Sequence, residues 1–487
     1  MTVLRQLPAF THLSLRSAAI AFATFLSAVA LPMTSDAFDA PLPKGLPAYG
    51  KEASLPPLQV EQKTLPNGLT IWVLPRTGGP PKVDFVLTLR GGLAQDDFTH
   101  PGLSQFMADM LKEGTTLRDS RQVAEDLQSY GAQLDSSAGN DGITLSASGL
   151  ASNATRLITL LSEVALQPAF AQDEVDLRKL NAVQALHLSE ADPSYLAQRA
   201  LLKLIYPEHA YQNVLPTEPG ILTITPEMLQ IEHARRFRPD SALLIIGGRI
   251  DTTYALQMAE RVFGDWRNDG KPLTPVAAAA TTVPAQFAFV QRDGSVQSAI
   301  RIGRPAIAAD SPDYFPLMLA NAVLGDGFSS RLNQNLREDK GYTYGAGSRM
   351  RAERAGGSLV AQANVRNEVT GAALGEFVKE YARMGSEPVA DDELMLTKRY
   401  LAGGYLLLNQ SLGEVMQTLS SFWLVGLPPQ TLSDYVPKLQ AVSAAQVQAM
   451  GKKYYAPGQQ SIVVVGDAQV QDQLKSYGDF PLVDKDN

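Results

Sequence analysis

Alternating apolar and polar positions mark several strands in the first third of the chain. Residues 65–69 read LPNGL, which places an Asn-Gly turn between two strand-like runs, the second covering residues 69–74. Residues 83–89 and 142–149 have the same strand character. Residues 38–57 are rich in proline and lack periodicity, so they predict an extended lead-in to the folded part.

Between these strands the apolar spacing changes to three and four residues, which is typical of amphipathic helices. The most regular run ends before Gly114 and contains Leu103, Phe106, Met107, Met110 and Leu111. Helices are also predicted over residues 120–130, ended by Gly131, and over residues 152–165, where Ser152 is expected to cap the first turn. This mixture of strands and helices predicts an α+β layered fold.

A long-range repeat indicates that the chain contains two related halves. Residues 224–248 recur as residues 442–466, each copy reading as a hydroxyl-capped helix, a proline turn and an apolar strand that ends in glycine. The interval from Pro239 to Pro457 equals the interval from Gly248 to Gly466, so the two copies align without a gap. Matching elements at one fixed offset predict two homologous domains.

The repeat sets the expected domain boundaries. We place an N-terminal domain at residues 48–267 and a C-terminal domain at residues 285–475. Residues 268–284 carry several prolines and four consecutive alanines, and they are expected to form the linker.

The first 37 residues have the character of a secretory signal peptide. They carry Arg5 and Arg16, an apolar run over residues 18–31, and a small-residue site that ends at Ala37. Cleavage is expected after Ala37, with residues 28–30 as the alternative site. The run is shorter than the about 20 residues that cross a bilayer, so we expect export to the periplasm without a stable membrane span; an uncleaved anchor is the other interpretation.

Composition narrows the classes of function. The chain has 487 residues, of which 45% are hydrophobic and 19% charged, as in globular proteins of several domains. Its formal net charge of −8 argues against nucleic acid as a partner. It contains no cysteine, which excludes disulfides, thiol catalysis and thiolate metal sites.

Four motifs carry a resemblance to a known family. They are residues 65–69, residues 102–115, residues 206–211 (YPEHAY) and, most specific of all, residues 328–344, which read FSSRLNQNLREDKGYTY. On these motifs the chain resembles the pitrilysin/insulinase superfamily over nearly its whole mature length. That superfamily includes the mitochondrial processing peptidase and the core subunits of the respiratory cytochrome complex. The resemblance implies that each half is a mainly antiparallel sheet with helices packed on it, the two halves being joined by the linker in a clamshell.

The resemblance also shows where a metal centre has been lost. Active relatives carry an inverted motif, His-x-x-Glu-His, in which two histidines bind zinc from one helix face and the glutamate acts as general base. These positions correspond here to Gln105, Ala108 and Asp109. A later glutamate ligand corresponds to Ala185, counted back from Asp192-Pro193. No ligand and no base remains, so we expect no zinc and no other cofactor in this subunit.

Two further side chains have competing interpretations. Gln105 and Asp109 share one helix face and such a pair can bind a hard cation weakly. We prefer a polar helix flank that faces a cavity or a partner, because zinc sites generally need His or Cys. His209, in the third motif, is expected to be structural.

In the second half, the resemblance implies a pair that contacts the bound peptide. Family members use an Arg and a Tyr seven residues apart, which correspond here to Arg337 and Tyr344. Arginine supplies a rigid fork of donors and tyrosine a phenolic donor, both suited to carbonyl oxygens and developing negative charge. The structural alternative is that Arg337 pairs with Glu338 or Asp339 and that Tyr344 faces the core.

The resemblance thus implies that the chain keeps a peptide-binding pair and has lost its metal site. This combination predicts the non-catalytic, substrate-binding subunit of a heterodimeric periplasmic zinc metallopeptidase that degrades peptides or unfolded segments. The partner would be a homologous subunit that carries His-x-x-Glu-His and brings the zinc. The peptide would be held extended, by adding a strand to a sheet edge. The alternatives are a peptidase-like scaffold or binding protein with no proteolytic role, and an autonomous peptidase with an unorthodox metal. The sequence specifies neither the substrate nor whether the partner is a second copy of this chain.

Overall fold

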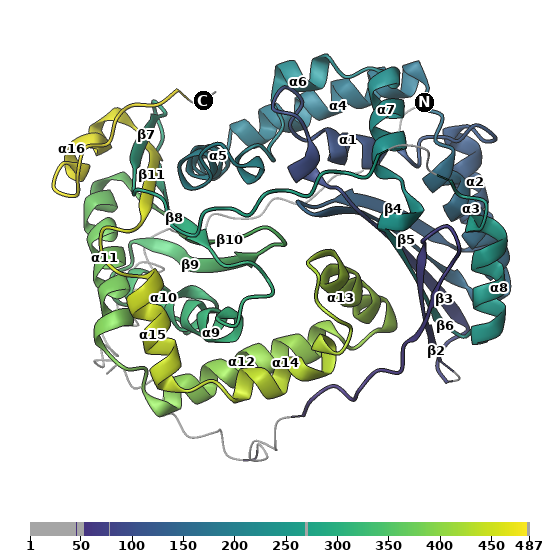
Figure 1. The fold of residues 1–487 in the computed structure, drawn as a ribbon. Coiled ribbons are helices and arrows are strands. Elements are labelled where there is room, and N and C mark those ends of the chain that lie inside the picture. Colours follow the sequence, from purple (N-terminus) through teal and green to yellow (C-terminus); the bar gives the residue numbers. More distant parts are fainter. Residues whose placement is uncertain (1–44, 46–52, 77, 268–270, 485–487) are drawn as a thin grey trace, which may run out of the picture. The chain divides into compact units, whose positions relative to one another are not determined.

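The computed structural model of the chain describes residue 45 and residues 53–76, 78–267 and 271–484 (Figure 1). Residues Glu52–Asn487 form one compact unit. The expected signal peptide, residues 1–37, lies outside the described residues. Among the described residues, no helix has both the length and the apolar character needed to cross a membrane.

The first half of the unit contains a six-stranded sheet. Its strands are β1 (Glu61–Thr64), β2 (Thr70–Pro75), β3 (Lys82–Arg90), β4 (Gln133–Ala138), β5 (Gly142–Leu150) and β6 (Ala242–Gly248). Its helices are α1 (Leu103–Met110), α2 (Ser120–Tyr130), α3 (Ala154–Leu166), α4 (Gln172–Glu190), α5 (Pro193–Ile205), α6 (Glu218–Leu222), α7 (Pro226–Arg236) and α8 (Thr252–Phe263). The strand order is β1-β2-β6-β3-β5-β4, and only the β2–β6 pair is parallel.

The second half contains a five-stranded sheet. Its strands are β7 (Phe287–Gln291), β8 (Gln297–Ala306), β9 (Thr343–Ala352), β10 (Gly357–Arg366) and β11 (Ser461–Gly466). Its helices are α9 (Tyr314–Gly325), α10 (Arg331–Asn333), α11 (Thr370–Ser386), α12 (Asp391–Leu408), α13 (Leu412–Leu424), α14 (Thr431–Gln440), α15 (Ala444–Tyr454) and α16 (Gln471–Leu474). The order is β7-β11-β8-β10-β9, with β7 and β11 as the one parallel pair.

The two sheets share one topology, which confirms the predicted repeat. Strands β2 to β6 are arranged 2-6-3-5-4, and strands β7 to β11 are arranged 7-11-8-10-9, the same permutation of chain order. The helices α7 (226–236) and α15 (444–454) have the same length. The offset between their first residues, and between their last residues, equals the offset between Pro239 and Pro457. The α+β fold with a mainly antiparallel sheet in each half is therefore as the resemblance implied.

Hydroxyl caps begin both of these repeated helices, as the sequence predicts. Thr225 Oγ1 accepts a hydrogen bond from the Met228 amide at 3.2 Å, and Ser443 Oγ accepts one from the Gln446 amide at 3.3 Å. The predicted cap at Ser152 is wrong. That residue lies inside a 3₁₀ turn (Ala151–Asn153), so α3 begins only after it and takes no side-chain cap.

Each half contributes one helix to the sheet of the other half. Helix α5 packs against β8 and β11, and α13 packs against β3 and β6 (Figure 1). Both contacts are close at a glycine of the strand: a Cβ on Gly303 would lie 2.9 Å from Leu201 Cδ2, and one on Gly247 would lie 2.5 Å from Met416 Sδ, so these side chains would have to shift. This exchange joins the two halves far more firmly than a linker alone.

The predicted linker has no regular secondary structure where it is described. Residues 271–284 contain no helix or strand, and the Ala279 amide donates to the carbonyl of Ala355 at 2.6 Å. His209 also holds this segment, since its Nδ1 accepts from the Tyr211 amide at 3.1 Å and its Nε2 lies 2.8 Å from the Ala277 carbonyl oxygen. The expected structural role of His209 is therefore confirmed. The exact domain boundaries on either side of the linker stay a prediction.

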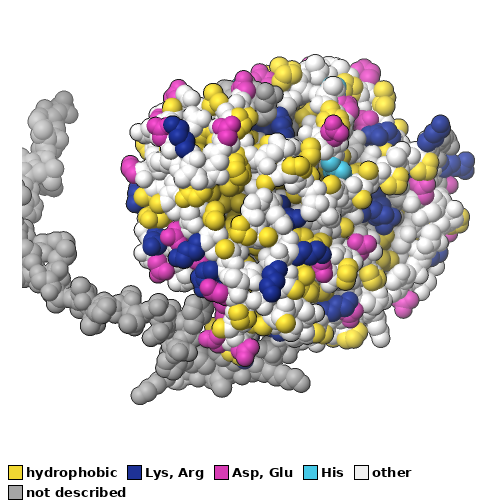
Figure 2. Space-filling view, turned by 60° about the vertical axis from the view of Figure 1, so that its left-hand side comes forward, with side chains coloured by type: hydrophobic (Ala, Val, Ile, Leu, Met, Phe, Trp, Pro, Cys, Tyr) yellow, Lys and Arg dark blue, Asp and Glu magenta, His cyan; other side chains and the backbone are white. Residues whose placement is uncertain are grey.

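Charges of both signs are interspersed on the face shown in Figure 2. A nucleic-acid-binding surface usually gathers its lysines and arginines into a stripe or patch. The described residues visible on that face form no such patch.

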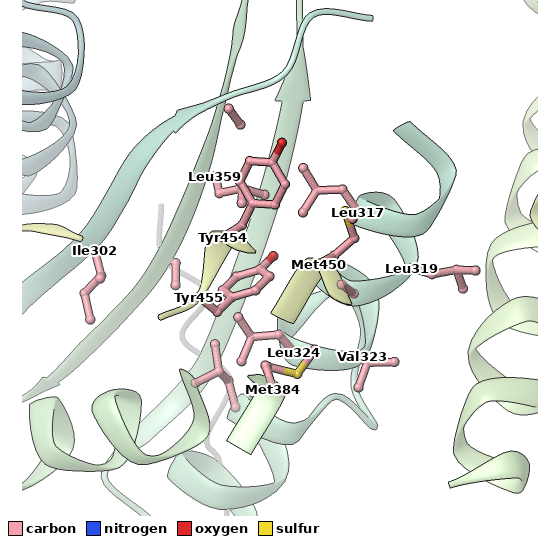
Figure 3. Packing of buried hydrophobic residues seen from close by; sticks show 14 of the residues in the cluster. Ile302, Leu317, Leu319, Val323, Leu324, Leu359, Met384, Met450, Tyr454 and Tyr455 are labelled. Atoms are coloured by element: carbon pink, nitrogen blue, oxygen red, sulfur yellow. The ribbon is translucent and has the colours of Figure 1, made fainter. Parts of the chain in front are cut away.

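The core of the second half lies between its sheet and its helices (Figure 3). Leu317 and Leu324 of α9 pack there with Met384 of α11 and with Met450 and Tyr454 of α15. Close packing of this kind makes the sheet a rigid support for the side chains at its edge.

Candidate functional site

Helix α1 carries the three positions that the resemblance assigns to the lost zinc motif. The side-chain amide of Gln105 donates to Asp109 Oδ1 at 2.7 Å, and its carbonyl oxygen accepts from the Ala138 amide of β4 at 2.9 Å. Ala108 is completely buried, and its carbonyl oxygen accepts from Ser136 Oγ at 2.6 Å. The helix is therefore fastened to β4 by the residues that replace the metal ligands.

Arg178 of α4 forms an ion pair with Asp109 through Nη2 and Oδ2. Its guanidinium carbon also lies 5.8 Å from the centre of the Phe106 ring, on the same helix as Asp109. Ala185, the fourth motif position, is exposed and lies seven residues further along α4, which is about 10 Å of helix. Its assignment stays a prediction, and the structure does not bring it to Asp109. The sequence carries no signal that singles out Arg178.

These residues do not fit a zinc ion. A zinc site needs three or four ligands from His, Cys or carboxylate side chains, and only Asp109 among the α1 positions belongs to these types. Its two oxygens are already used by an amide and a guanidinium, and the latter brings a positive charge where a cation would have to lie. Among the described residues, no three His, Asp or Glu side chains are grouped so that they could hold a metal ion.

The ion pair predicts that restoring the motif alone will not restore zinc binding. The variant with Gln105→His, Ala108→Glu and Asp109→His is expected to hold no equimolar zinc after dialysis, because Arg178 still places a cation beside the new ligands. Adding Arg178→Glu removes that charge and should raise zinc affinity at least about tenfold. Metal content by atomic emission and competition titration with a chelator measure both. One tightly held zinc in the triple variant would contradict the argument.

Arg337 and Tyr344 lie close together in the second half. Arg337 is on a π-helical turn (Gln334–Asp339), where its guanidinium stacks 4.3 Å from the centre of the Phe328 ring. Its Nε lies 3.3 Å from Glu338 Oε1, and both side chains of this pair are partly exposed. Tyr344, on β9, is 91% exposed. A tyrosine that faces the core is thereby excluded, whereas the pairing of Arg337 with Glu338 exists.

Both side chains line one cavity of about 630 Å³. It lies beside β9, the edge strand of the second sheet, whose outer edge has no strand partner among the described residues. Asn333 and Thr343 of the same motif also line it, and the further polar lining residues, which no motif singled out, are Ser194, Gln297, Arg301, Gln362 and Asn364. None of the four lost-motif positions belongs to the described lining. Within one chain, the Arg337–Tyr344 pair and the predicted positions of the lost zinc motif therefore do not share a cavity.

A second polar cluster joins the turns of the two sheets. Tyr211 Oη donates to Asp141 Oδ1 at 2.9 Å and accepts from the Ala355 amide at 3.0 Å, while the Arg354 amide donates to Asp141 Oδ2 at 2.8 Å. Burial, together with the nearby Asp141 carboxylate, raises the pKa of Glu353 to about 7. Two carboxyl groups thus share the contact between the halves, and one of them prefers to be protonated.

This cluster predicts a pH-dependent stability. The pKa of Glu353 is about 7 in the folded chain against an ordinary 4.5, so the folded state binds more protons between these values. The free energy of unfolding should therefore fall as the pH rises from about 4.5 to about 7. Glu353→Gln keeps the neutral form at every pH and should flatten this slope. Thermal unfolding midpoints at several pH values measure it, and an unchanged slope in the variant would show that another group titrates.

Two family profiles match the chain. Residues 73–217 match the family described as insulinase, peptidase family M16, and residues 223–401 match the M16 inactive domain. The first profile covers the segment with the lost motif, and the second covers Arg337 and Tyr344.

Curated relatives extend over most of the chain at low identity. An uncharacterized zinc protease of Rickettsia felis is 22% identical over 391 residues, covering 77% of this chain and 91% of that protein. A Helicobacter pylori protein named non-peptidase homolog YmxG is 24% identical over 362 residues, covering 72% of this chain and 82% of that protein.

Solved structures agree with the fold. The M16 inactive domain structure from Pseudomonas fluorescens matches with a TM-score of 0.78 at 24% identity, covering 84% of this chain and 98% of that one. A protease structure from Helicobacter pylori matches with a TM-score of 0.77 at 16% identity, covering 84% of this chain and all of that one. At these identities the likeness concerns the fold.

Proposed function

Because the chain belongs to peptidase family M16, the pitrilysin/insulinase superfamily, as a member without the zinc motif, we propose that it is the substrate-binding, non-catalytic subunit of a heterodimeric zinc metallopeptidase. The observation that carries the proposal is an asymmetry. Arg337 and Tyr344 line a cavity beside β9, which has no outer strand partner among the described residues, whereas Asp109, at a position predicted to replace a metal ligand, is ion-paired with Arg178.

The partner in this proposal is a homologous subunit that carries His-x-x-Glu-His and brings the zinc. Two relatives support this arrangement by their names, since one is called an uncharacterized zinc protease and the other a non-peptidase homolog, as expected of the two kinds of subunit. Arg337 and Tyr344 would then act on a peptide that the partner cleaves. The guanidinium and the phenolic hydroxyl both donate hydrogen bonds, so they can bind peptide carbonyl oxygens and stabilise negative charge that develops there.

The substrate in this proposal is an extended peptide or an unfolded segment. Strand β9 is the edge of its sheet, and two of its backbone groups already bond to side chains: the Ala346 amide donates to Asn333 Oδ1 and the Ser348 carbonyl accepts from Asn321 Nδ2. In this proposal the peptide pairs by strand addition with the remaining outward backbone groups of β9. Residues 1–37 support a location in the bacterial periplasm, because they have the charged start, apolar run and small-residue site of an export signal. Fractionation of cells that produce the full chain tests this location.

Reconstitution tests the function. The purified chain alone should cleave no peptide, and mixing it with an exported homologue that carries the motif should give endopeptidase activity well above that of the homologue alone. A partner whose motif glutamate is changed to glutamine is the control, since it should assemble with this chain and remain inactive.

Two results would contradict the proposal. Chelator-sensitive cleavage by the isolated chain would make it an autonomous peptidase. Stable assembly with the partner, without any gain in activity or in substrate affinity, would make it a scaffold.

A further inference from the structure

The cavity of Arg337 and Tyr344 has a second arginine in its wall. Arg301 lies in the middle of β8, between Val463 of β11 and Gln362 of β10. Its side chain comes from a central strand of a five-stranded sheet and is only 6% exposed. Charged side chains are rarely buried to this degree unless they are paired.

Arg301 has few partners for a buried guanidinium. Its Nη1 donates to the carbonyl of Ile300 at 3.1 Å, and its Nε is buried without a hydrogen-bond partner in the described part of the chain. The Asp192 carboxylate acts on Arg301 by raising its pKa, and its Oδ1 accepts from the Ser194 amide at 2.8 Å. Burial lowers the pKa of Arg301 to about 10, so the group still carries its charge at neutral pH. An unpaired donor of this kind is costly and is best satisfied by an anion.

A neighbouring arginine on the same strand shows the contrast. Arg304 is buried to a similar degree, but its guanidinium donates to three carbonyl oxygens and to the side chain of Gln459. It does not line the cavity. Strand β8 therefore satisfies one buried arginine within the protein and leaves the other facing an open space.

The charged side chains that line that space have one sign, while Glu338, beside Arg337, and Asp192, which acts on Arg301, lie outside the lining. Arg301 and Arg337 line it, and the described lining contains no Asp or Glu. The remaining polar lining consists of amides and hydroxyls, which can donate to an anion as well. A volume of about 630 Å³ is within the range of ligand pockets and holds a short piece of peptide.

We propose that Arg301 and Arg337 bind a carboxylate of the peptide, so that this subunit selects peptides by an acidic group. The inference rests on the proposed function only in taking a peptide as the ligand. The carboxylate belongs either to an Asp or Glu side chain or to the peptide C-terminus, since both present the same two oxygens to a guanidinium fork.

Binding of matched peptides to the isolated full chain tests the proposal. One fluorescein-labelled pair differs by Glu against Gln at an internal position and carries an amidated C-terminus in both members. The other pair lacks acidic side chains and differs by a free against an amidated C-terminus. Fluorescence anisotropy should show the acidic member of at least one pair bound about 10-fold to 100-fold more tightly. The pair that shows the difference identifies the source of the carboxylate.

Variants connect the preference to Arg301. Arg301→Met replaces a buried charge by an apolar chain of similar length, which cores generally tolerate, and should bring the affinity ratio close to one. Arg304→Met is the matched control on the same strand and should leave the ratio unchanged. If Arg301→Met does not fold, Arg337→Gln at the partly exposed second arginine should lower the ratio instead.

The outcomes separate this inference from the proposed function. Equal affinities within both pairs, or a ratio that survives the change at Arg301, would overturn the carboxylate site while leaving the subunit a peptide binder. Failure to bind any of the peptides would overturn the carboxylate site together with peptide binding by the isolated chain. Reconstitution with the zinc-bearing partner tests the proposed function separately, whichever of these results is obtained.

Discussion

Asp96→Ala is expected to lower the free energy of unfolding by about 3 kcal/mol, because it removes the completely buried one of the two carboxylates that pair with Arg236 and leaves only Glu232. Neither side chain of this pair has any exposed surface, and Arg236 Nη2 donates to Asp96 Oδ1 at 2.8 Å. Chemical denaturation of the full chain measures the loss.

The effect is large because this pair organises the start of α1. Both carboxylate oxygens of Asp96 accept from the Ser104 amide, at 3.2 and 3.1 Å, while Arg236 Nη1 donates to the carbonyls of Gly91 and Gly92 at 3.0 and 2.9 Å. Burial raises the pKa of Asp96, and Arg236 and Ser104 act in the opposite direction. The helix that has lost its metal ligands is thus still held in place by a buried charge network.

Two controls isolate the cause. Glu125→Ala breaks an exposed pair with Arg121 and should cost at most about 0.5 kcal/mol. The double variant Asp96→Leu with Arg236→Met removes both charges and should be more stable than Asp96→Ala. A loss below about 1 kcal/mol for Asp96→Ala would show that the network contributes little.

Arg337→Ala is expected to reduce the turnover of the reconstituted peptidase by about 10²–10³-fold, the usual cost of removing one donor from a developing oxyanion. The rate of peptide cleavage at saturating substrate measures it. Stability and assembly should hardly change, because this side chain is 37% exposed and its ion pair lies at the surface.

Matched variants separate a catalytic contribution from a surface ion pair. Glu338→Gln removes the same pair and leaves the guanidinium, so its turnover should stay within about twofold of the unchanged complex. Tyr344→Phe removes one hydroxyl from a side chain that makes little packing contact, so any loss of turnover belongs to the hydroxyl. Equal turnover for Arg337→Ala and Glu338→Gln would assign Arg337 a purely structural role.

Much of the fold follows from patterns within short stretches of the chain. The ends of α2 and its stop at Gly131 agree with the predicted residues 120–130. The fixed offset between the two copies of the repeat predicts that a helix and a strand recur, and the identical order of both sheets confirms it. Such features depend on spacing, caps and turn residues that lie within a few positions of one another.

Sequence patterns of this kind predict only part of the candidate site. Arg337 and Tyr344 belong to one motif, and the structure places both at one cavity. Arg301 lies well before that motif in the sequence. It is on β8, a mainly apolar strand that carries two arginines, and the sequence does not distinguish one from the other. Only the packing of β8 beneath the cavity distinguishes it from Arg304, which has the same residue type and similar burial.

The amino-acid sequence alone determined the element types, the repeat and the absence of the family's zinc-motif residues, because each is read from residue types at fixed spacings along the chain and needs no knowledge of which distant side chains meet. Only the three-dimensional structure determined that α5 packs on the second sheet and α13 on the first. It also determined that Arg178 forms an ion pair with Asp109 and that Asp141 lies close to Glu353. The members of each charged pair belong to elements that are far apart in the sequence, and Asp141 and Glu353 even come from different halves. No local periodicity records which distant side chains will meet, and the charge state and exposure of each group depend on that meeting.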